Sequence, residues 1–164
     1  MEFQVVQGDI SKQKADALVN AANTGLRMGS GVAGALKRGA EGPINEEAVE
    51  KGPVELGGVA VTDAYELDAE HVIHAAAMPQ GGEATGKSIR DATSNTLEKA
   101  DELGCSSIVI PALGCGVAGF SVEEGGGIIA EEIRDFEGNS LDDVRLIAYG
   151  DEEYETLREC WESV

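Results

Sequence analysis

The sequence predicts an α/β domain, a three-layer α/β/α sandwich around a mixed, largely parallel central sheet. Short apolar runs rich in Val, Ile and Ala alternate with segments whose apolar residues recur at helical spacing. Glycine and proline gather between these segments. The 164 residues are enough to bury the core of one domain, and no change of composition marks an internal boundary. We therefore expect a single domain over residues 1–164.

The predicted strands are short and rich in β-branched or small apolar residues. The first alternates in polarity and stops at Gly8-Asp9, and Gly81-Gly82 marks a turn after the fourth. The fifth contains the apolar run 108–110 (Ile-Val-Ile), which indicates a buried strand. In chain order the strands are expected over residues 2–7, 16–20, 58–65, 71–77, 106–110 and 144–149.

The predicted helices are recognised by their apolar period or by signals at their ends. A glycine-rich segment opens the first, and Pro43 and Gly52-Pro53 bound the second. The third and the last have apolar residues on one face. Ser121-x-x-Glu124 is a capping-box signature for the fourth. In chain order the helices are expected over residues 32–38, 44–51, 87–103, 121–136 and 152–161.

The composition is strongly acidic, with 31 acidic against 12 basic residues and a formal net charge of −19. No basic patch is available for a phosphate backbone, so we expect no direct nucleic-acid binding. Such a charge favours a halophilic origin, since screening over about 3 Å at 1 M salt suppresses self-repulsion; an ordinary acidic protein is the alternative. No apolar run reaches the length of a membrane span and no signal peptide is visible, so we expect a cytoplasmic protein without membrane contact.

Cysteine and histidine are too few and too scattered to predict a metal site. Cys105, Cys115 and Cys160 form no C-x-x-C pair and give no disulfide framework. His71 and His74 lack a partner at ligand spacing, and His74 lies in an apolar run that is typical of a hydrogen-bonded core histidine. We therefore expect neither a metal nor a cofactor.

The pattern Gly-x-Gly-Val-Ala-Gly occurs twice, at 29–34 and at 114–119. Each copy follows a predicted strand and leads toward a predicted helix. Glycines at such a junction let backbone N–H groups approach an anion, and a helix N-terminus adds partial positive charge. Two such loops indicate a site that holds a diphosphate from both sides.

An ordinary dinucleotide-binding fold is disfavoured by the context of these loops. That fingerprint belongs in the first strand-to-helix turn, with an acidic residue about 20 positions further on. Here the first copy follows a second strand, and the second copy comes late in the chain. Neither copy ends in the Gly-Lys-Ser/Thr of a P-loop. A nucleotide-dependent oxidoreductase is therefore the least favoured function.

Each polar or aromatic residue that could contact a ligand also has a simpler structural interpretation when it is considered alone. Asp9 and Asn23 are both typical of turns or caps. Cys115 has no adjacent histidine, so a small loop filler is favoured over a nucleophile. Phe120 and Tyr149 are compatible with core aromatics.

Together these segments resemble a macrodomain. The resemblance rests on Gly8-Asp9-Ile10, on 17–23 (Ala-Leu-Val-Asn-Ala-Ala-Asn), on 29–34, on 72–75 and on 111–120. It covers nearly the whole chain and keeps the family's motif order. It implies the α/β/α fold stated above and a site for ADP-ribose or an ADP-ribosylated substrate, including ADP-ribosylated proteins.

The resemblance also implies roles for individual residues. Asp9 would read the adenine amine with Ile10 beside it, and Tyr149 would stack on adenine. The two glycine loops would wrap the diphosphate, and Asn23 and Phe120 would meet the ribose remote from adenine. The implied ligand-binding residues are Asp9, Ile10, Ala22, Asn23, Gly31, Val32, Ala33, Gly114, Cys115, Gly116, Val117, Ala118, Gly119, Phe120 and Tyr149.

Departures from the family pattern bear on activity. Ala33 stands where one hydrolytic branch has Asp, and Met28 stands where another has His. Hydrolysis would then depend on a water positioned by Asn23 and a substrate phosphate, a weaker arrangement than a dedicated base. The expected substrates are a mono-ADP-ribosyl ester on protein, O-acetyl-ADP-ribose or ADP-ribose 1″-phosphate. A reader that binds ADP-ribose without turnover is the alternative.

Overall fold

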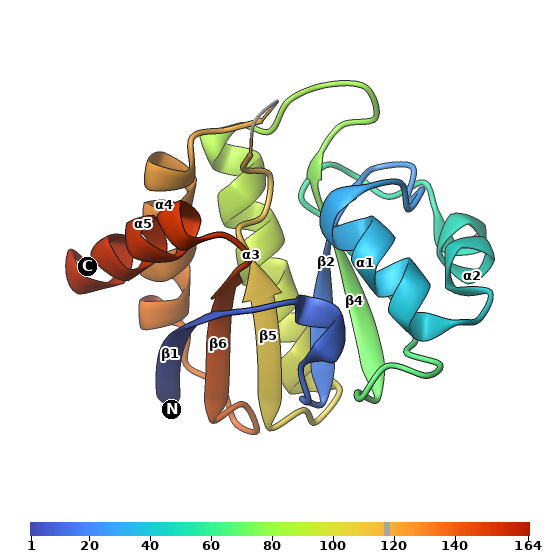
Figure 1. Ribbon diagram of the computed structural model, residues 1–164, viewed down its shortest axis with the longest axis horizontal. Coiled ribbons are helices and arrows are strands. Elements are labelled where there is room, and N and C mark those ends of the chain that lie inside the picture. Colours follow the sequence, from blue (N-terminus) through green and yellow to red (C-terminus); the bar gives the residue numbers. More distant parts are fainter. Residues whose placement is uncertain (117–118) are drawn as a thin grey trace.

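The fold is built on one six-stranded sheet with the order β1-β6-β5-β2-β4-β3 (Figure 1). The computed structural model describes residues 1–116 and 119–164. The strands are β1 (Glu2–Gln7), β2 (Ala17–Asn23), β3 (Val59–Asp63), β4 (His71–Met78), β5 (Ser107–Pro111) and β6 (Asp143–Ala148).

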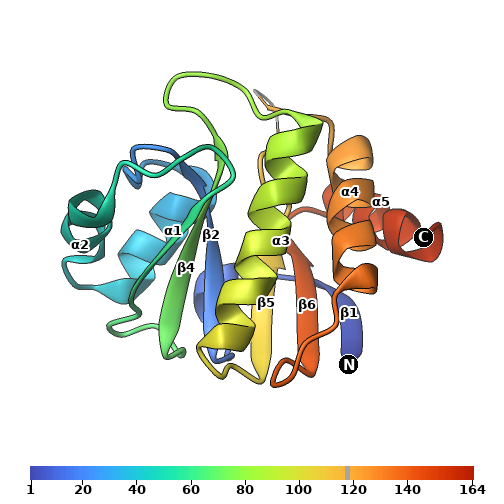
Figure 2. The same ribbon diagram turned by 180° about the vertical axis from the view of Figure 1, so that it is seen from behind.

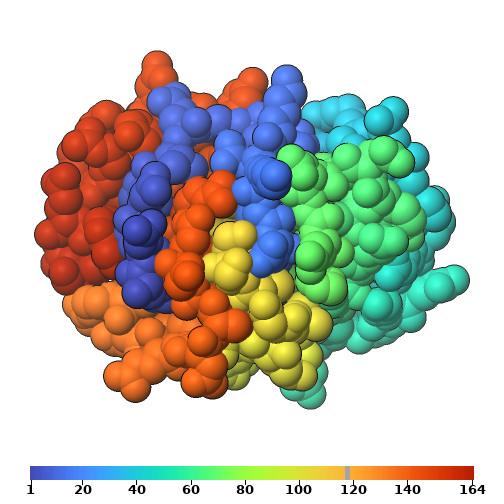
Figure 3. Space-filling model, turned by 90° about the horizontal axis from the view of Figure 1, so that it is seen from below, coloured from blue at the N-terminus to red at the C-terminus, as the bar shows by residue number. Residues whose placement is uncertain are grey.

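All neighbouring strands pair in parallel except β3, which runs antiparallel to β4 at one edge. The carboxyl ends of β1, β6, β5, β2 and β4 therefore lie along the same edge of the sheet. The loops that follow these strands meet there, which is where α/β proteins place their ligands. Figure 3 looks onto the opposite edge, where the segments that precede the strands lie side by side.

Helices cover both faces of the sheet, which confirms the predicted three-layer α/β/α class. On one face lie α3 (Gly86–Glu102), α4 (Val122–Asp135) and α5 (Asp151–Glu162). The other face carries α1 (Gly31–Ala40), α2 (Ile44–Lys51) and the short 3-10 helix η1 (Ile10–Lys12). α3 is behind the sheet in Figure 1 and in front of it in Figure 2. No helix in the described part of the chain is long and apolar enough to cross a bilayer.

Alternate residues of each central strand enter two separate cores. On β2, Val19 packs under α3 and α4 while Leu18 packs under α1. On β5, Ile108 and Ile110 enter the first core and Val109 the second. Each of these side chains is fully buried, and burial of one contributes about 1.5–3 kcal/mol. Burial on both faces explains why these strands are largely apolar in sequence.

The elements follow the predicted ranges with shifts of at most three residues at their ends. The largest shift is in β2, predicted over 16–20, which continues to Asn23. After a register shift at Ala22/Asn23, Asn23 pairs with Met78 of β4. Pairing with a neighbouring strand thus extends β2 into a segment of small and polar residues that local propensity does not favour.

Three successive glycines inside α4 have no explanation from the sequence, and the structure explains two of them. A Cβ at Gly125 would collide with Cys115 Sγ. A Cβ at Gly126 would lie 2.8 Å from Leu157 Cδ2 and 3.0 Å from Cys160 Sγ on α5. These glycines therefore let α4 approach the loop after β5 and the last helix. Gly127 has open space around it, and nothing in the structure explains it.

Candidate functional site

A cleft of about 610 Å³ runs along the carboxyl edge of the sheet, on the face that carries α1. Its walls come from the ends of the parallel strands, from the first turns of α1 and α5, and from the loop after β5. The residues that line it are Gly8, Asp9, Ile10, Ala21, Ser30, Gly31, Val32, Ala35, Arg38, Met78, Pro111, Ala112, Cys115, Ile147, Tyr149 and Glu153.

The N-terminus of α1 opens into the middle of this cleft. The N–H groups of its first turn have no partner within the helix. Ser30, the N-cap residue, makes no side-chain capping bond, and the first turn contains no acidic residue. By contrast, the first turns of α2, α4 and α5 all contain acidic residues, and α3 is closed by a capping box. In a chain this acidic, α1 thus keeps its N-terminal amides and partial positive charge for an external anion.

Gly31 begins this turn with a positive φ of 64°, a conformation that glycine adopts without strain. A Cβ at Gly34 would lie only 2.9 Å from the carbonyl oxygen of Gly29. The first glycine loop is therefore a tight strand-to-helix turn whose backbone faces the cleft, as its sequence predicts.

The second glycine loop is held together by its own backbone bonds. The N–H groups of Gly119 and Phe120 donate to the carbonyl oxygens of Gly116 and Gly114, at 3.1 and 2.9 Å, and that of Gly116 donates to Phe120 at 3.3 Å. Gly114 has a φ of +71°, and a Cβ there would lie 2.7 Å from that of Ala84. The four amides of Cys115, Gly116, Gly119 and Phe120 all have internal partners.

Val117 and Ala118, which the family resemblance places on the ligand, lie outside the described residues. Of the predicted residues in this loop, Cys115 lines the cleft. Burial, with the nearby Glu153 carboxylate, raises the pKa of its thiol to about 12. A thiol that stays protonated is a poor nucleophile, in agreement with the loop-filler interpretation.

Asp9 lies at the end of the cleft formed by β1 and is also the N-cap of η1. Its Oδ1 accepts hydrogen bonds from the backbone N–H of Ser11 at 2.9 Å and from the Ser11 hydroxyl at 2.7 Å. The Ser11 hydroxyl bond lowers the pKa of Asp9, and the charges of Lys12 and Arg38 add to this effect. Asp9 is thus a fixed carboxylate that stays ionised, and it serves as a cap and as a cleft residue together.

Tyr149 directly follows β6, next to Asp9 in the order of the strand ends. It lines the cleft, and 80% of its surface is exposed. The core-aromatic interpretation is therefore wrong for Tyr149, whose ring is free to stack on a planar ligand. Phe120 differs, because it is half-buried against the core under α3 and α4 and does not line the cleft.

Asn23 lies at the end of β2, and its side chain closes the following turn. Its Oδ1 accepts from the N–H of Gly25 at 3.0 Å, and its Nδ2 donates to the carbonyl oxygen of Arg27 at 3.4 Å. Neither Asn23 nor Ala22 is among the residues that line the cleft, and Ala33 lies on the buried face of α1. The described geometry thus gives Asn23 the turn role that its residue type favours.

Sequence reasoning missed two charged residues of the cleft, Arg38 and Glu153. Arg38 belongs to α1, on the same helical face as Gly31 and Ala35, so the period of the helix is the signal that could have found it. Its Nη1 lies 3.2 Å from the place of a Cβ on Gly34, over the first turns of the helix. Glu153 lies in the first turn of α5, four residues after Tyr149.

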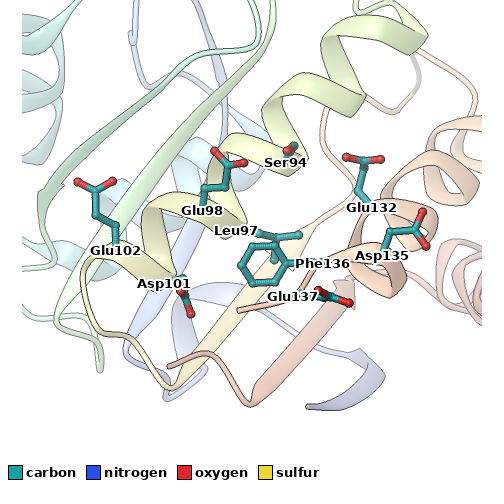
Figure 4. A pocket seen from close by; sticks show the side chains of 9 residues that line it. All are labelled: Ser94, Leu97, Glu98, Asp101, Glu102, Glu132, Asp135, Phe136 and Glu137. Carbon is teal, nitrogen blue, oxygen red and sulfur yellow. The ribbon is translucent and has the colours of Figure 1, made fainter. Parts of the chain in front are cut away.

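Two other hollows lack the features of an anion site. A groove of about 440 Å³ between α3 and α4 is crowded with carboxylates, among them Glu98, Glu102 and Glu132 (Figure 4). Asp101 at its edge accepts N–H bonds from Asn139, at 2.9 Å, and from two further residues of the loop before β6, which lowers its pKa to about 2. The other hollow, about 600 Å³, lies at the opposite edge of the sheet and mixes both signs of charge.

The fold and the cleft together define an α/β sandwich of the class that takes its ligand at the carboxyl ends of its strands. The macro domain family model matches residues 19–135. The chain therefore belongs to the macro domain family.

Solved macrodomains share nearly the whole fold. The Oceanobacillus iheyensis macrodomain with ADP superposes with a TM-score of 0.85 at 26% identity, over 97% of this chain and 89% of that one. The Trypanosoma brucei macrodomain in complex with ADP-ribose superposes with a TM-score of 0.87 at 28% identity, over 95% of this chain and 67% of that one.

Relatives at higher identity carry no named activity. An uncharacterized protein of Sulfolobus acidocaldarius is 38% identical over 167 residues, which cover 99% of this chain and 92% of that protein. An uncharacterized protein of Mycobacterium tuberculosis is 41% identical over 151 residues, or 92% of this chain. The chain spans only 42% of the length of that mycobacterial relative.

Proposed function

We propose that the protein binds ADP-ribose in the cleft at the carboxyl edge of the sheet. The observation that carries this proposal is the N-terminus of α1, uncapped and free of acidic residues, which faces the cleft between Tyr149 and the end of β2. The complex of the T. brucei macrodomain with ADP-ribose, on a closely similar fold, supports the choice of ligand.

The order of the strand ends sets the expected direction of the ligand. Asp9 and Tyr149 follow the neighbouring strands β1 and β6, so adenine would lie there, with the ring of Tyr149 on its face and the Asp9 carboxylate toward its amine. The diphosphate would lie against the amides of α1. The remote ribose would then reach the ends of β2 and β4, where Ala21 and Met78 line the cleft.

Calorimetric titration tests this proposal with ADP-ribose and two of its fragments, AMP and ribose 5-phosphate. In the proposed binding mode the cleft contacts both the adenine end and the remote ribose end of the ligand. ADP-ribose should therefore bind at least about tenfold more tightly than either fragment. Equal affinity for ADP-ribose and AMP would show that the cleft recognises only a nucleoside monophosphate and would contradict the proposal.

We also propose that the protein slowly hydrolyses a small ADP-ribosyl derivative. A water would be held between a substrate phosphate and Asn23, whose Nδ2 would have to exchange its long 3.4 Å bond to Arg27 for the water. The candidate substrates are the protein-linked mono-ADP-ribosyl ester, O-acetyl-ADP-ribose and ADP-ribose 1″-phosphate. The ionisable groups that line the described cleft are Asp9, Arg38, Cys115, Tyr149 and Glu153, all on elements other than β2 and β4. Rate would therefore come from positioning rather than from a titrating base.

Release of ADP-ribose from each of these substrates, measured for the wild type and for Asn23→Ala, tests the hydrolase proposal. Turnover should be slow and nearly flat from about pH 6 to 8, because a neutral amide does not titrate there. Asn23→Ala should lower release far more than it lowers affinity. If the wild type binds ADP-ribose well and releases none from any substrate, the protein is a reader of ADP-ribosylated partners.

A further inference from the structure

One carboxylate inside the cleft has no part in the proposed function. The first turn of α5 contains Asp151, Glu152 and Glu153. The first two are exposed, as acidic residues at a helix N-terminus commonly are. Glu153 is half-buried and lines the cleft.

The position of Glu153 lies between two parts of the proposed site. Glu153 and Tyr149 both line the cleft, and the negative charge of Glu153 helps to raise the pKa of the Cys115 thiol. Tyr149 follows β6, where adenine would lie, and Cys115 belongs to the glycine loop after β5, beside the diphosphate. In ADP-ribose, the group between adenine and the diphosphate is the adenosine ribose. In the proposed binding mode, Glu153 would therefore lie beside the 2′- and 3′-hydroxyls of that sugar.

The surroundings of Glu153 also favour a hydrogen bond from a hydroxyl group to its carboxylate. Burial raises the pKa of its carboxyl group, and the N–H of Tyr149 offsets part of this rise. Among the described residues, no lysine or arginine forms an ion pair with it. The only cation that lines the described cleft, Arg38, is on α1 across from α5. A hydrogen bond from a hydroxyl group stabilises a carboxylate in these surroundings, whereas the negative charge of a phosphate is repelled by it.

We propose that Glu153 reads the adenosine ribose, accepting a hydrogen bond from its 2′-hydroxyl, so that the cleft takes ADP-ribose and rejects ADP-ribose that carries a 2′-phosphate. This inference rests on the proposed function and goes beyond it, because it assigns the choice between the two ligands to one residue. The physical logic is that of an acidic residue at the ribose of a dinucleotide site, here supplied by the last helix.

Calorimetry with ADP-ribose, its 2′-deoxy form and its 2′-phosphate tests the assignment on three proteins: the wild type, Glu153→Gln and Glu152→Gln. The Glu152 variant is the matched control, because it removes the same charge from the neighbouring residue of the same turn without touching the cleft. All titrations are made at one salt concentration.

The wild type and Glu152→Gln should both bind the 2′-phosphate at least about tenfold more weakly than ADP-ribose, and Glu153→Gln should lose most of this difference. Removing the 2′-hydroxyl should weaken binding to the wild type by more than it weakens binding to Glu153→Gln, which shows that the two groups are coupled.

Equal wild-type affinity for ADP-ribose and its 2′-phosphate would overturn the inference. It would also be overturned if Glu153→Gln and Glu152→Gln changed the ratio of these two affinities equally. Both results leave ADP-ribose binding intact. If the wild type does not bind ADP-ribose itself, the proposed function fails and this inference fails with it.

Discussion

At the scale of a single residue, Asp9 combines a capping role with the ligand role that we propose for it. As an N-cap it uses Oδ1 for two bonds from Ser11, which fix the carboxylate in the wall of the cleft. An alanine at this position would remove the cap and the carboxylate together. Asparagine keeps an oxygen for Ser11 and removes the charge, so it separates the two roles.

Asp9→Asn should reduce the preference for ADP-ribose over its inosine analogue. A carboxylate accepts from the adenine amine but meets an oxygen acceptor in the same place on hypoxanthine, whereas an amide can turn to donate. The preference should fall by about tenfold, the value of one charge-assisted hydrogen bond. Competitive titration with the two ligands measures it.

Ser11→Ala is the control for Asp9, because it removes one of the two capping bonds and keeps the carboxylate. Its preference for adenine should stay near that of the wild type. If Asp9→Asn lowers the affinity for ADP-ribose and for its inosine analogue equally, Asp9 does not recognise the base.

At this scale the sequence placed the residues that directly follow β1 and β6 and missed residues further along α1 and α5. Asp9 and Tyr149 line the cleft because a strand end fixes their place, and Gly31 lines it from the first turn of α1. Arg38 and Glu153 reach the cleft from α1 and α5, whose orientation depends on packing that no local pattern shows. Asn23 was expected at the ligand from its place at a strand end and from the family resemblance, and the structure shows its amide bonded within its own turn.

At the scale of elements, a buried polar network joins three strands. His74 of β4 is fully buried, with its Nδ1 3.0 Å from Asn20 Nδ2 on β2 and its Nε2 3.0 Å from Thr62 Oγ1 on β3. Burial lowers the pKa of His74 from 6.5 to about 4; Lys51 adds to this shift, and Glu47 opposes it. The network confirms that His74 is a hydrogen-bonded core residue.

His74 should make the protein less stable in mild acid. Its pKa in the folded state lies below the unfolded value of 6.5, so only the unfolded chain binds a proton as the pH falls toward about 4. The contribution is complete above pH 6.5 and is lost progressively between the two values. From pH 7 to about 4.5 the free energy of unfolding should fall by about 2 kcal/mol more in the wild type than in His74→Gln.

Urea unfolding of both proteins at each pH gives this difference directly. Subtracting the two curves removes the contribution of the many carboxylates, which titrate in both proteins alike. Parallel curves from pH 7 to about 4.5 would show that His74 already carries its proton in the folded state, or that it is hydrated there.

The elements themselves were largely predictable, and the reason is physical. Strands buried on both faces are largely apolar, and Gly or Pro lies next to several element ends, as at Gly8 after β1 and Pro43 before α2. The sequence did not predict the continuation of β2 to Asn23, which depends on pairing with β4. It also gave no reason for Gly125 and Gly126, because the side chains that exclude a Cβ belong to Cys115, Leu157 and Cys160.

For the whole molecule, the net charge of −19 is the dominant property. Carboxylates crowd even the groove between α3 and α4 (Figure 4). We propose that the protein works at high salt, in the cytoplasm of a halophilic organism. Raising KCl from about 0.1 M to about 1 M shortens the screening length from about 10 Å to about 3 Å, which should raise the melting temperature and strengthen binding of the anionic ligand.

Thermal unfolding and ADP-ribose titration in KCl and NaCl test this proposal. If screening is the cause, the two salts should act alike over this range. A steady loss of affinity and of melting temperature from dilute buffer upward would contradict the proposed adaptation to salt.

The most direct test of the account compares ADP-ribose binding by Ser30→Glu and Ser30→Gln. Ser30 lines the cleft at the N-terminus of α1, makes no capping bond and has a φ of −112° that any residue adopts, so both variants should fold. The two side chains are nearly equal in size and differ in charge. The account predicts that Ser30→Gln binds ADP-ribose within about threefold of the wild type and that Ser30→Glu binds at least about a hundredfold more weakly, because its carboxylate takes the place of the diphosphate at the helix N-terminus. Equal binding by the two variants would contradict it, because the diphosphate would then lie elsewhere.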